Sequence, residues 1–167
     1  MIPAKWRIHL VLAVVFAFTA GGTGAQDYGL SASALKDDSV EFLYPEQLNV
    51  TAGQITPVAL HFRVLPGLHI NSHTPSGGFL IPTVFSLPPS TGIRLSDLSY
   101  PAGSELTLPV YPKTRLSVYS GDFVIHAHVL ATRGDHMLEG KLRYQACNMN
   151  QCLPPKTVTV PLDVVAK

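Results

Sequence analysis

The sequence carries little charge. Charged residues make up 14% of the 167 residues, where a soluble domain usually has about a quarter, and the formal net charge is +1. Without the first 25 residues, which include Lys5 and Arg7, 10 basic residues stand against 11 acidic ones. A nucleic-acid binder needs a basic surface to neutralise phosphates, so this balance excludes that class of protein and predicts no nucleic-acid partner.

Long apolar runs are also missing, except for one near the N-terminus. A largely apolar run of 13 residues, 8–20, follows a basic start and precedes small residues. This layout is typical of a secretory signal peptide, and the run is shorter than the about 20 residues that a membrane span needs. We predict a signal peptide over residues 1–25, a flexible leader over 26–37 and one exported domain over 38–167, with no membrane span. An uncleaved N-terminal anchor is the alternative.

Room for helices is scarce, because 14 prolines and 13 glycines interrupt the chain. Between them apolar and polar residues alternate with a period of two, which predicts half-buried strands. The four longest predicted strands are Thr56–Leu65, Asp122–Ala131, His136–Cys147 and Thr157–Val165. The shorter ones are Val40–Leu43, Leu68–Ile70, Val84–Leu87, Leu95–Tyr100 and Leu116–Tyr119. This pattern favours an all-β fold, an antiparallel β-sandwich.

Cysteine is rare, since Cys147 and Cys152 are the only two. In an exported protein such a pair predicts a disulfide. Closing a loop of six residues stabilises a fold by only roughly 2 kcal/mol in the chain-entropy model. The alternation in His136–Cys147 places Cys147 on the outward face, and an accessible short disulfide is of the type that exchanges with other thiols. A purely structural disulfide is the alternative.

The residues around the cysteines match a known motif. The run Tyr144-Gln145-Ala146-Cys147, followed by Cys152-Leu153-Pro154-Pro155, resembles the cysteine motif of the N-terminal periplasmic domain of the thiol:disulfide interchange protein DsbD. The upstream run Gly67–Ser72 is similar to a second stretch of the same family. The resemblance covers about residues 38–165, which is nearly the whole chain after the predicted signal peptide.

The resemblance implies an immunoglobulin-like β-sandwich in the periplasm that acts as a protein-disulfide reductase through Cys147 and Cys152. It implies that a thioredoxin-like donor supplies electrons and that periplasmic disulfide proteins accept them, with Cys152 forming the mixed disulfide. Dithiol exchange needs no metal or organic cofactor. Two departures stand out. Four residues separate the cysteines instead of five, and the membrane and thioredoxin-like domains of the full family protein are missing. We therefore expect a stand-alone monomer with an external donor.

Three further residues are predicted to surround the cysteine pair. By the resemblance, the run that contains His69 and Asn71 lies beside the cysteines, where either side chain could hydrogen-bond a thiolate or assist proton transfer. A role in stabilising a turn is the alternative for both. Tyr144, from the cysteine motif itself, is the third candidate.

Two long loops are predicted, Thr74–Pro82 and Pro101–Pro112, and loops of this length are often functional. In the family, a loop with an aromatic residue covers the cysteine pair. By position, Tyr111 is the best match for that covering residue, followed by Val110. The alternative is that Tyr111 packs into the edge of the sandwich as part of the core.

The histidines raise a weaker hypothesis. His126 and His128 lie two residues apart on one predicted strand face, a spacing that suits metal ligands, although an exposed polar face explains it as well. We predict no metal site. Two classes of function therefore compete, a thiol:disulfide exchange module and a non-enzymatic immunoglobulin-like binding module with a structural disulfide. The reduction potential of the cysteine pair separates them.

Overall fold

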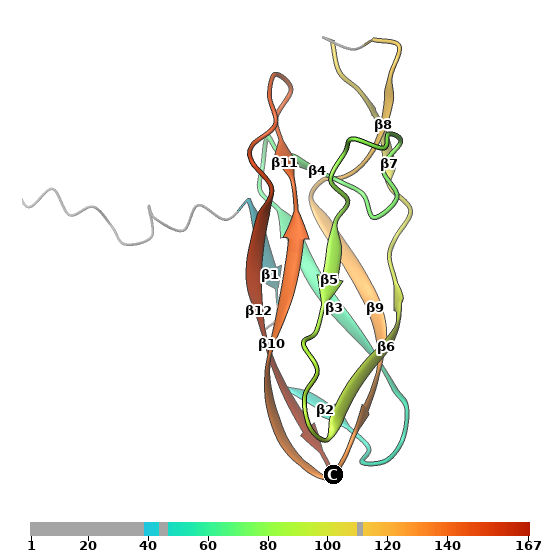
Figure 1. Ribbon diagram of the computed structural model, residues 1–167, viewed down its shortest axis with the longest axis vertical. Helices are drawn as coiled ribbons and strands as arrows, with labels where there is room; N and C mark the ends of the chain where they lie inside the picture. The colour runs from blue at the N-terminus through green and yellow to red at the C-terminus, as the bar shows by residue number, and fades with distance from the viewer. Residues whose placement is uncertain (1–38, 44–46, 110–111) are drawn as a thin grey trace, which may run out of the picture. The chain divides into compact units, whose positions relative to one another are not determined.

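The computed structural model describes residues 39–43, 47–109 and 112–167, which contain twelve strands and no helix (Figure 1). The strands are β1 (Val40–Leu43), β2 (Leu48–Val50), β3 (Thr56–Val64), β4 (His69–Asn71), β5 (Val84–Ser86), β6 (Ile93–Ser99), β7 (Ser104–Thr107), β8 (Arg115–Tyr119), β9 (Asp122–Ala131), β10 (Gly134–Tyr144), β11 (Ala146–Cys147) and β12 (Lys156–Ala166). None of the described segments is a helix long and apolar enough to cross a membrane.

The strands form three hydrogen-bonded sheets. Two of them, β1-β3-β9-β6 and β2-β12-β10-β5, contribute side chains to one core. Phe62 and Ile125 come from the first sheet, Leu142 and Val160 come from the second, and all four are at most 1% exposed. All strand pairs are antiparallel except β2 with β12. The prediction of an all-β, immunoglobulin-like sandwich is confirmed.

Alternation along the long strands explains why they pack as they do. In β9 the residues Phe123, Ile125, Ala127 and Val129 are all buried, as the period of two predicts. In β10 the inward position 140 is a glycine, and a Cβ there would lie 2.5 Å from Cζ of the buried Phe85. Glycine thus lets the Phe85 ring pack directly against the β10 backbone.

The third sheet, β11-β4-β8-β7, lies at the end of the sandwich opposite the C-terminus (Figure 1). It explains one wrong prediction, because the single strand expected over His136–Cys147 is in fact two. β10 ends at Tyr144 and is paired with β12 up to that residue, whereas β11 pairs with β4 in the third sheet. The change of sheet falls on Gln145, immediately before the cysteine hairpin.

Two strands were not predicted. β7 lies inside the stretch expected to be a loop, Pro101–Pro112, so that prediction is wrong for residues 104–107. Its residues are mostly exposed, and it is held at the sheet edge by backbone pairing with β8, which leaves little hydrophobic pattern in the sequence. β2 has only three residues and pairs with β12. The stretch Thr74–Pro82 contains no strand, as expected.

Candidate functional site

Cys147 and Cys152 form a disulfide with an S–S distance of 2.03 Å. The two residues also face each other as a β-bridge, and the Leu153 N–H donates to the Ala146 carbonyl oxygen at 2.8 Å. The side chain of Asn148 closes the turn between the cysteines, because its Oδ1 accepts the backbone N–H groups of Asn150 and Gln151 at 2.8 and 2.9 Å. Four intervening residues therefore suffice for a compact hairpin.

The two cysteines differ sharply in burial. Cys147 is 2% exposed, whereas Cys152 is an exposed residue. The prediction that Cys147 faces outward is wrong. The change of sheet at Gln145 interrupts the alternation, so that Ala146 and Cys147 are both buried as they join β4. Of the two cysteines, Cys152 is the one that a partner thiol can reach.

The structure places His69 on β4 directly opposite Cys147. His69 is 5% exposed, and its Nε2 atom is buried without a hydrogen-bond partner among the described residues. Burial lowers the pKa of the His69 imidazole, because desolvation disfavours the charged ring. A neutral imidazole therefore lies beside the buried member of the disulfide.

Asn71 connects the cysteine hairpin to the loop Thr74–Pro82. Its Nδ2 donates to the Ile81 carbonyl oxygen at 3.0 Å and to Gln145 Oε1 at 3.4 Å. The Gln145 Nε2 in turn donates at 3.2 Å to the carbonyl oxygen of Leu153, the residue after Cys152. Sequence reasoning included Gln145 in the motif but did not single it out, although it is the only polar residue between Tyr144 and Cys147.

The other predicted site residues are Tyr144, Tyr111 and Val110. Tyr144 is 1% exposed and belongs to the main hydrophobic core. Tyr111 and Val110, predicted to cover the cysteines, lie outside the residues that the structure describes.

Cys152 opens onto a groove of about 430 Å³. Phe79 and Leu80 from the long loop after β4, Leu108, Leu116 and Gln145 also line it. Phe79 is 82% exposed, which is unusual for an aromatic side chain. Sequence reasoning missed Phe79, although a lone aromatic residue in a loop rich in glycine, serine and proline was a visible signal.

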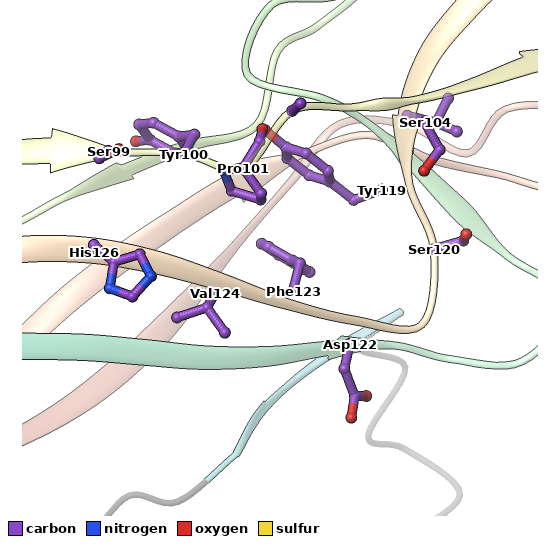
Figure 2. A pocket seen from close by; sticks show the side chains of 12 residues that line it. Ser99, Tyr100, Pro101, Ser104, Tyr119, Ser120, Asp122, Phe123, Val124 and His126 are labelled. Carbon is purple, nitrogen blue, oxygen red and sulfur yellow. The ribbon is translucent and has the colours of Figure 1, made fainter.

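A second hollow, of about 460 Å³, lies around Tyr100, Tyr119, Asp122 and His126 (Figure 2). The residues that line it include no cysteine. The Asp122 carboxylate accepts hydrogen bonds from Arg63, which lower the pKa of that carboxyl group. No group of three or more His, Cys, Asp or Glu residues in the described part of the chain is arranged to hold a metal ion.

His128, the second histidine considered as a metal ligand in the sequence, lies next to a carboxylate. His128 Nδ1 lies 3.2 Å from Asp97 Oδ2, and both side chains are on the surface. His128 thus contacts an acidic residue of β6, while His126 lines the second hollow.

The structure is thus an immunoglobulin-like β-sandwich with a short disulfide hairpin at one end, in which one cysteine is buried and one is exposed. The chain belongs to the family described as thiol:disulfide interchange protein DsbD, N-terminal, whose model matches residues 39–164. This confirms the resemblance found in the sequence.

Two solved structures similar to the chain are N-terminal domains of DsbD and ScsB. The N-terminal domain of DsbD from Neisseria meningitidis, in its reduced form, is 20% identical with a TM-score of 0.45, over 70% of this chain and 82% of that one. The N-terminal periplasmic domain of ScsB from Proteus mirabilis is 16% identical with a TM-score of 0.50, over 74% of this chain and 44% of that one. The second likeness supports the fold. No curated protein matches the chain.

Proposed function

We propose that the chain is a periplasmic protein-disulfide reductase that relays electrons through the Cys147–Cys152 pair. It accepts electrons from a thioredoxin-like donor and passes them to periplasmic proteins that contain disulfides. The observation that carries the proposal is the asymmetry of the pair, in which Cys152 is exposed and Cys147 is 2% exposed. The family and the periplasmic origin of the ScsB domain support the location. Export then uses residues 1–25, and residues 38–167 form the working domain.

The proposed chemistry is two consecutive thiol–disulfide exchanges. A donor thiolate attacks Sγ of Cys152, the Cys147–Cys152 bond breaks, and Cys147 leaves as a thiolate that takes up a proton. The second donor thiol then attacks the donor sulfur of the mixed disulfide and releases the reduced pair. In the second exchange the Cys152 thiolate attacks an acceptor disulfide, and Cys147 resolves the mixed disulfide. Two electrons pass from donor to acceptor.

The groove beside Cys152 supports docking of a protein partner. Phe79 is exposed at its rim, Leu80 and Leu108 line it, and none of its described lining residues is charged. Met149 and Leu153, on either side of Cys152, are 43% and 37% exposed. An apolar surface around a reactive sulfur favours a partner that also presents an apolar surface around its cysteine.

A single-cysteine variant is expected to trap a partner. In reduced Cys147→Ser, Cys152 attacks a thioredoxin-like protein that keeps only one active-site cysteine, activated as its mixed disulfide with thionitrobenzoate. Thionitrobenzoate leaves, and the new mixed disulfide between the two proteins persists because neither protein has a second thiol to resolve it. In Cys152→Ser the remaining thiol is buried, so we expect at least about tenfold less adduct. Non-reducing electrophoresis measures the adduct, and the double variant is the control.

Two results of the trapping experiment would contradict the proposal. Equal trapping by both single variants would show that burial does not decide which cysteine attacks. No adduct from either variant would indicate a structural disulfide in a binding module.

A further inference from the structure

The buried residue His69 has no function in the exchange chemistry described so far. It forms one of only two residue pairs between β4 and β11, Cys147 with His69 and Ala146 with Ile70. Residues directly opposite each other in an antiparallel pair project from the same face, with Cβ atoms about 4.5–5.5 Å apart. The Cys147 sulfur and the His69 ring therefore share one face of the β4–β11 pair.

A hydrogen bond between the side chains of two nearby residues, Asn71 and Gln145, shows which face this is. Asn71 lies two residues after His69, Gln145 lies two residues before Cys147, and the Asn71 Nδ2 donates to Gln145 Oε1 at 3.4 Å. His69 and Asn71 are alternate residues of β4 and point to the same side, so the His69 ring lies on the side where this hydrogen bond is seen, together with its cross-strand partner Cys147.

The His69 ring is buried with one nitrogen unused. Nε2 has no hydrogen-bond partner among the described residues, although an unpaired buried polar atom usually reduces stability by about 1–3 kcal/mol. Burial also lowers the pKa of the ring, so that it is neutral and has one nitrogen able to accept a proton. Unsatisfied buried groups of this kind are rare in native proteins, and a redox or catalytic role is one explanation for them.

The buried position of Cys147 creates a need for such an acceptor. Only a thiolate attacks a disulfide, and burial disfavours the ionised form of a thiol. Cys152 is exposed and can ionise in contact with water, whereas Cys147 is 2% exposed. The step in which Cys147 resolves a mixed disulfide therefore requires a nearby base.

We propose that His69 is the proton acceptor for Cys147 in the resolving step, an inference that rests on the exchange function proposed above. The Cys147 thiol proton moves to His69 Nε2, and the sulfur attacks Sγ of Cys152. The Cys147–Cys152 bond forms as the bond between Cys152 and the partner breaks, and the partner sulfur leaves as a thiolate. The imidazolium then returns its proton to that thiolate or to water.

The two steps can be separated with dithionitrobenzoate, an aromatic disulfide that releases one coloured thiolate at each step. With one equivalent of reagent, reduced protein releases the first thiolate when Cys152 attacks and the second when Cys147 resolves. For His69→Gln we expect an unchanged first release and a second release slowed by about 100-fold, the lower end of what acid–base catalysis contributes. The matched control is the exposed His126→Gln, for which both releases should equal those of the wild type.

The outcomes distinguish this inference from the exchange function itself. If wild-type protein releases no thiolate, the exchange function fails. If wild-type protein releases both and His69→Gln releases the second at the wild-type rate, the role of His69 is overturned while exchange stands.

A measurement on the unaltered protein covers the case in which His69→Gln does not fold. In protein with ¹⁵N-labelled histidine, reduction of the disulfide should shift the His69 ring nitrogen resonances, because a thiol replaces the disulfide beside the ring. The resonances of His126 should not move. Equal or absent shifts at both histidines would overturn the proposal.

Discussion

In the reduced and folded protein, Cys152 is expected to react with iodoacetamide at least about a hundredfold faster than Cys147. Cys147 is 2% exposed and its strand β11 is paired with β4, so it reacts only when this end of the sandwich opens. A local opening that requires about 3 kcal/mol reduces the reactive fraction by more than a hundredfold. The fold should survive reduction, because the six-residue loop contributes only roughly 2 kcal/mol of stability.

The comparison uses the two single-cysteine variants. The rate for Cys147→Ser reports Cys152, the rate for Cys152→Ser reports Cys147, and mass spectrometry follows both. In strong denaturant the two rates should become equal within a small factor, which controls for intrinsic reactivity. Equal rates in the folded protein would contradict the buried position of Cys147.

Replacing Leu142 by alanine is expected to lower the free energy of unfolding by about 2–5 kcal/mol. Leu142 is 0% exposed and lies on β10, opposite Phe85 of β5 and Val158 of β12. Its removal leaves a cavity in the core that joins the two main sheets. Because β10 leads directly into Gln145 and the cysteine hairpin, the same substitution should also increase the alkylation rate of Cys147.

Urea denaturation monitored by far-UV circular dichroism measures the change. The control is Arg143→Ala, the exposed neighbour on the same strand, for which we expect a change of no more than about 0.5 kcal/mol. A loss below about 1 kcal/mol for Leu142→Ala would show that the β10 face is not part of the core.

The strands were largely predictable because alternation is a local signal. β9 and β1 have the predicted bounds, and β3 and β12 differ from the prediction by one residue at one or both ends. The break at Gln145 was not predictable in this way. Whether a strand keeps its partner or moves to another sheet depends on residues far along the chain, here His69 and Ile70 of β4. The same break reversed the predicted exposure of Cys147.

In the sequence, the candidate site could be recognised only from residue types whose side chains commonly take part in exchange or proton transfer. The cysteine pair and the run that contains His69 and Asn71 stood out in the sequence. Gln145 acts through hydrogen bonds to Asn71, 74 residues away, and to Leu153. The role of Phe79 depends on its 82% exposure beside Cys152. Neither the hydrogen bonds of Gln145 nor the exposure of Phe79 can be read from the local sequence, although Phe79 stands out as the lone aromatic residue of its loop.

The reduction potential of the Cys147–Cys152 pair tests most directly whether this disulfide is exchanged or structural. The protein is equilibrated with graded glutathione redox buffers, and the reduced fraction is measured by alkylation. A potential between about −280 and −180 mV, the range of thioredoxin-like proteins and disulfide isomerases, is expected for a relay. A potential below about −300 mV, typical of structural disulfides, would contradict the exchange function.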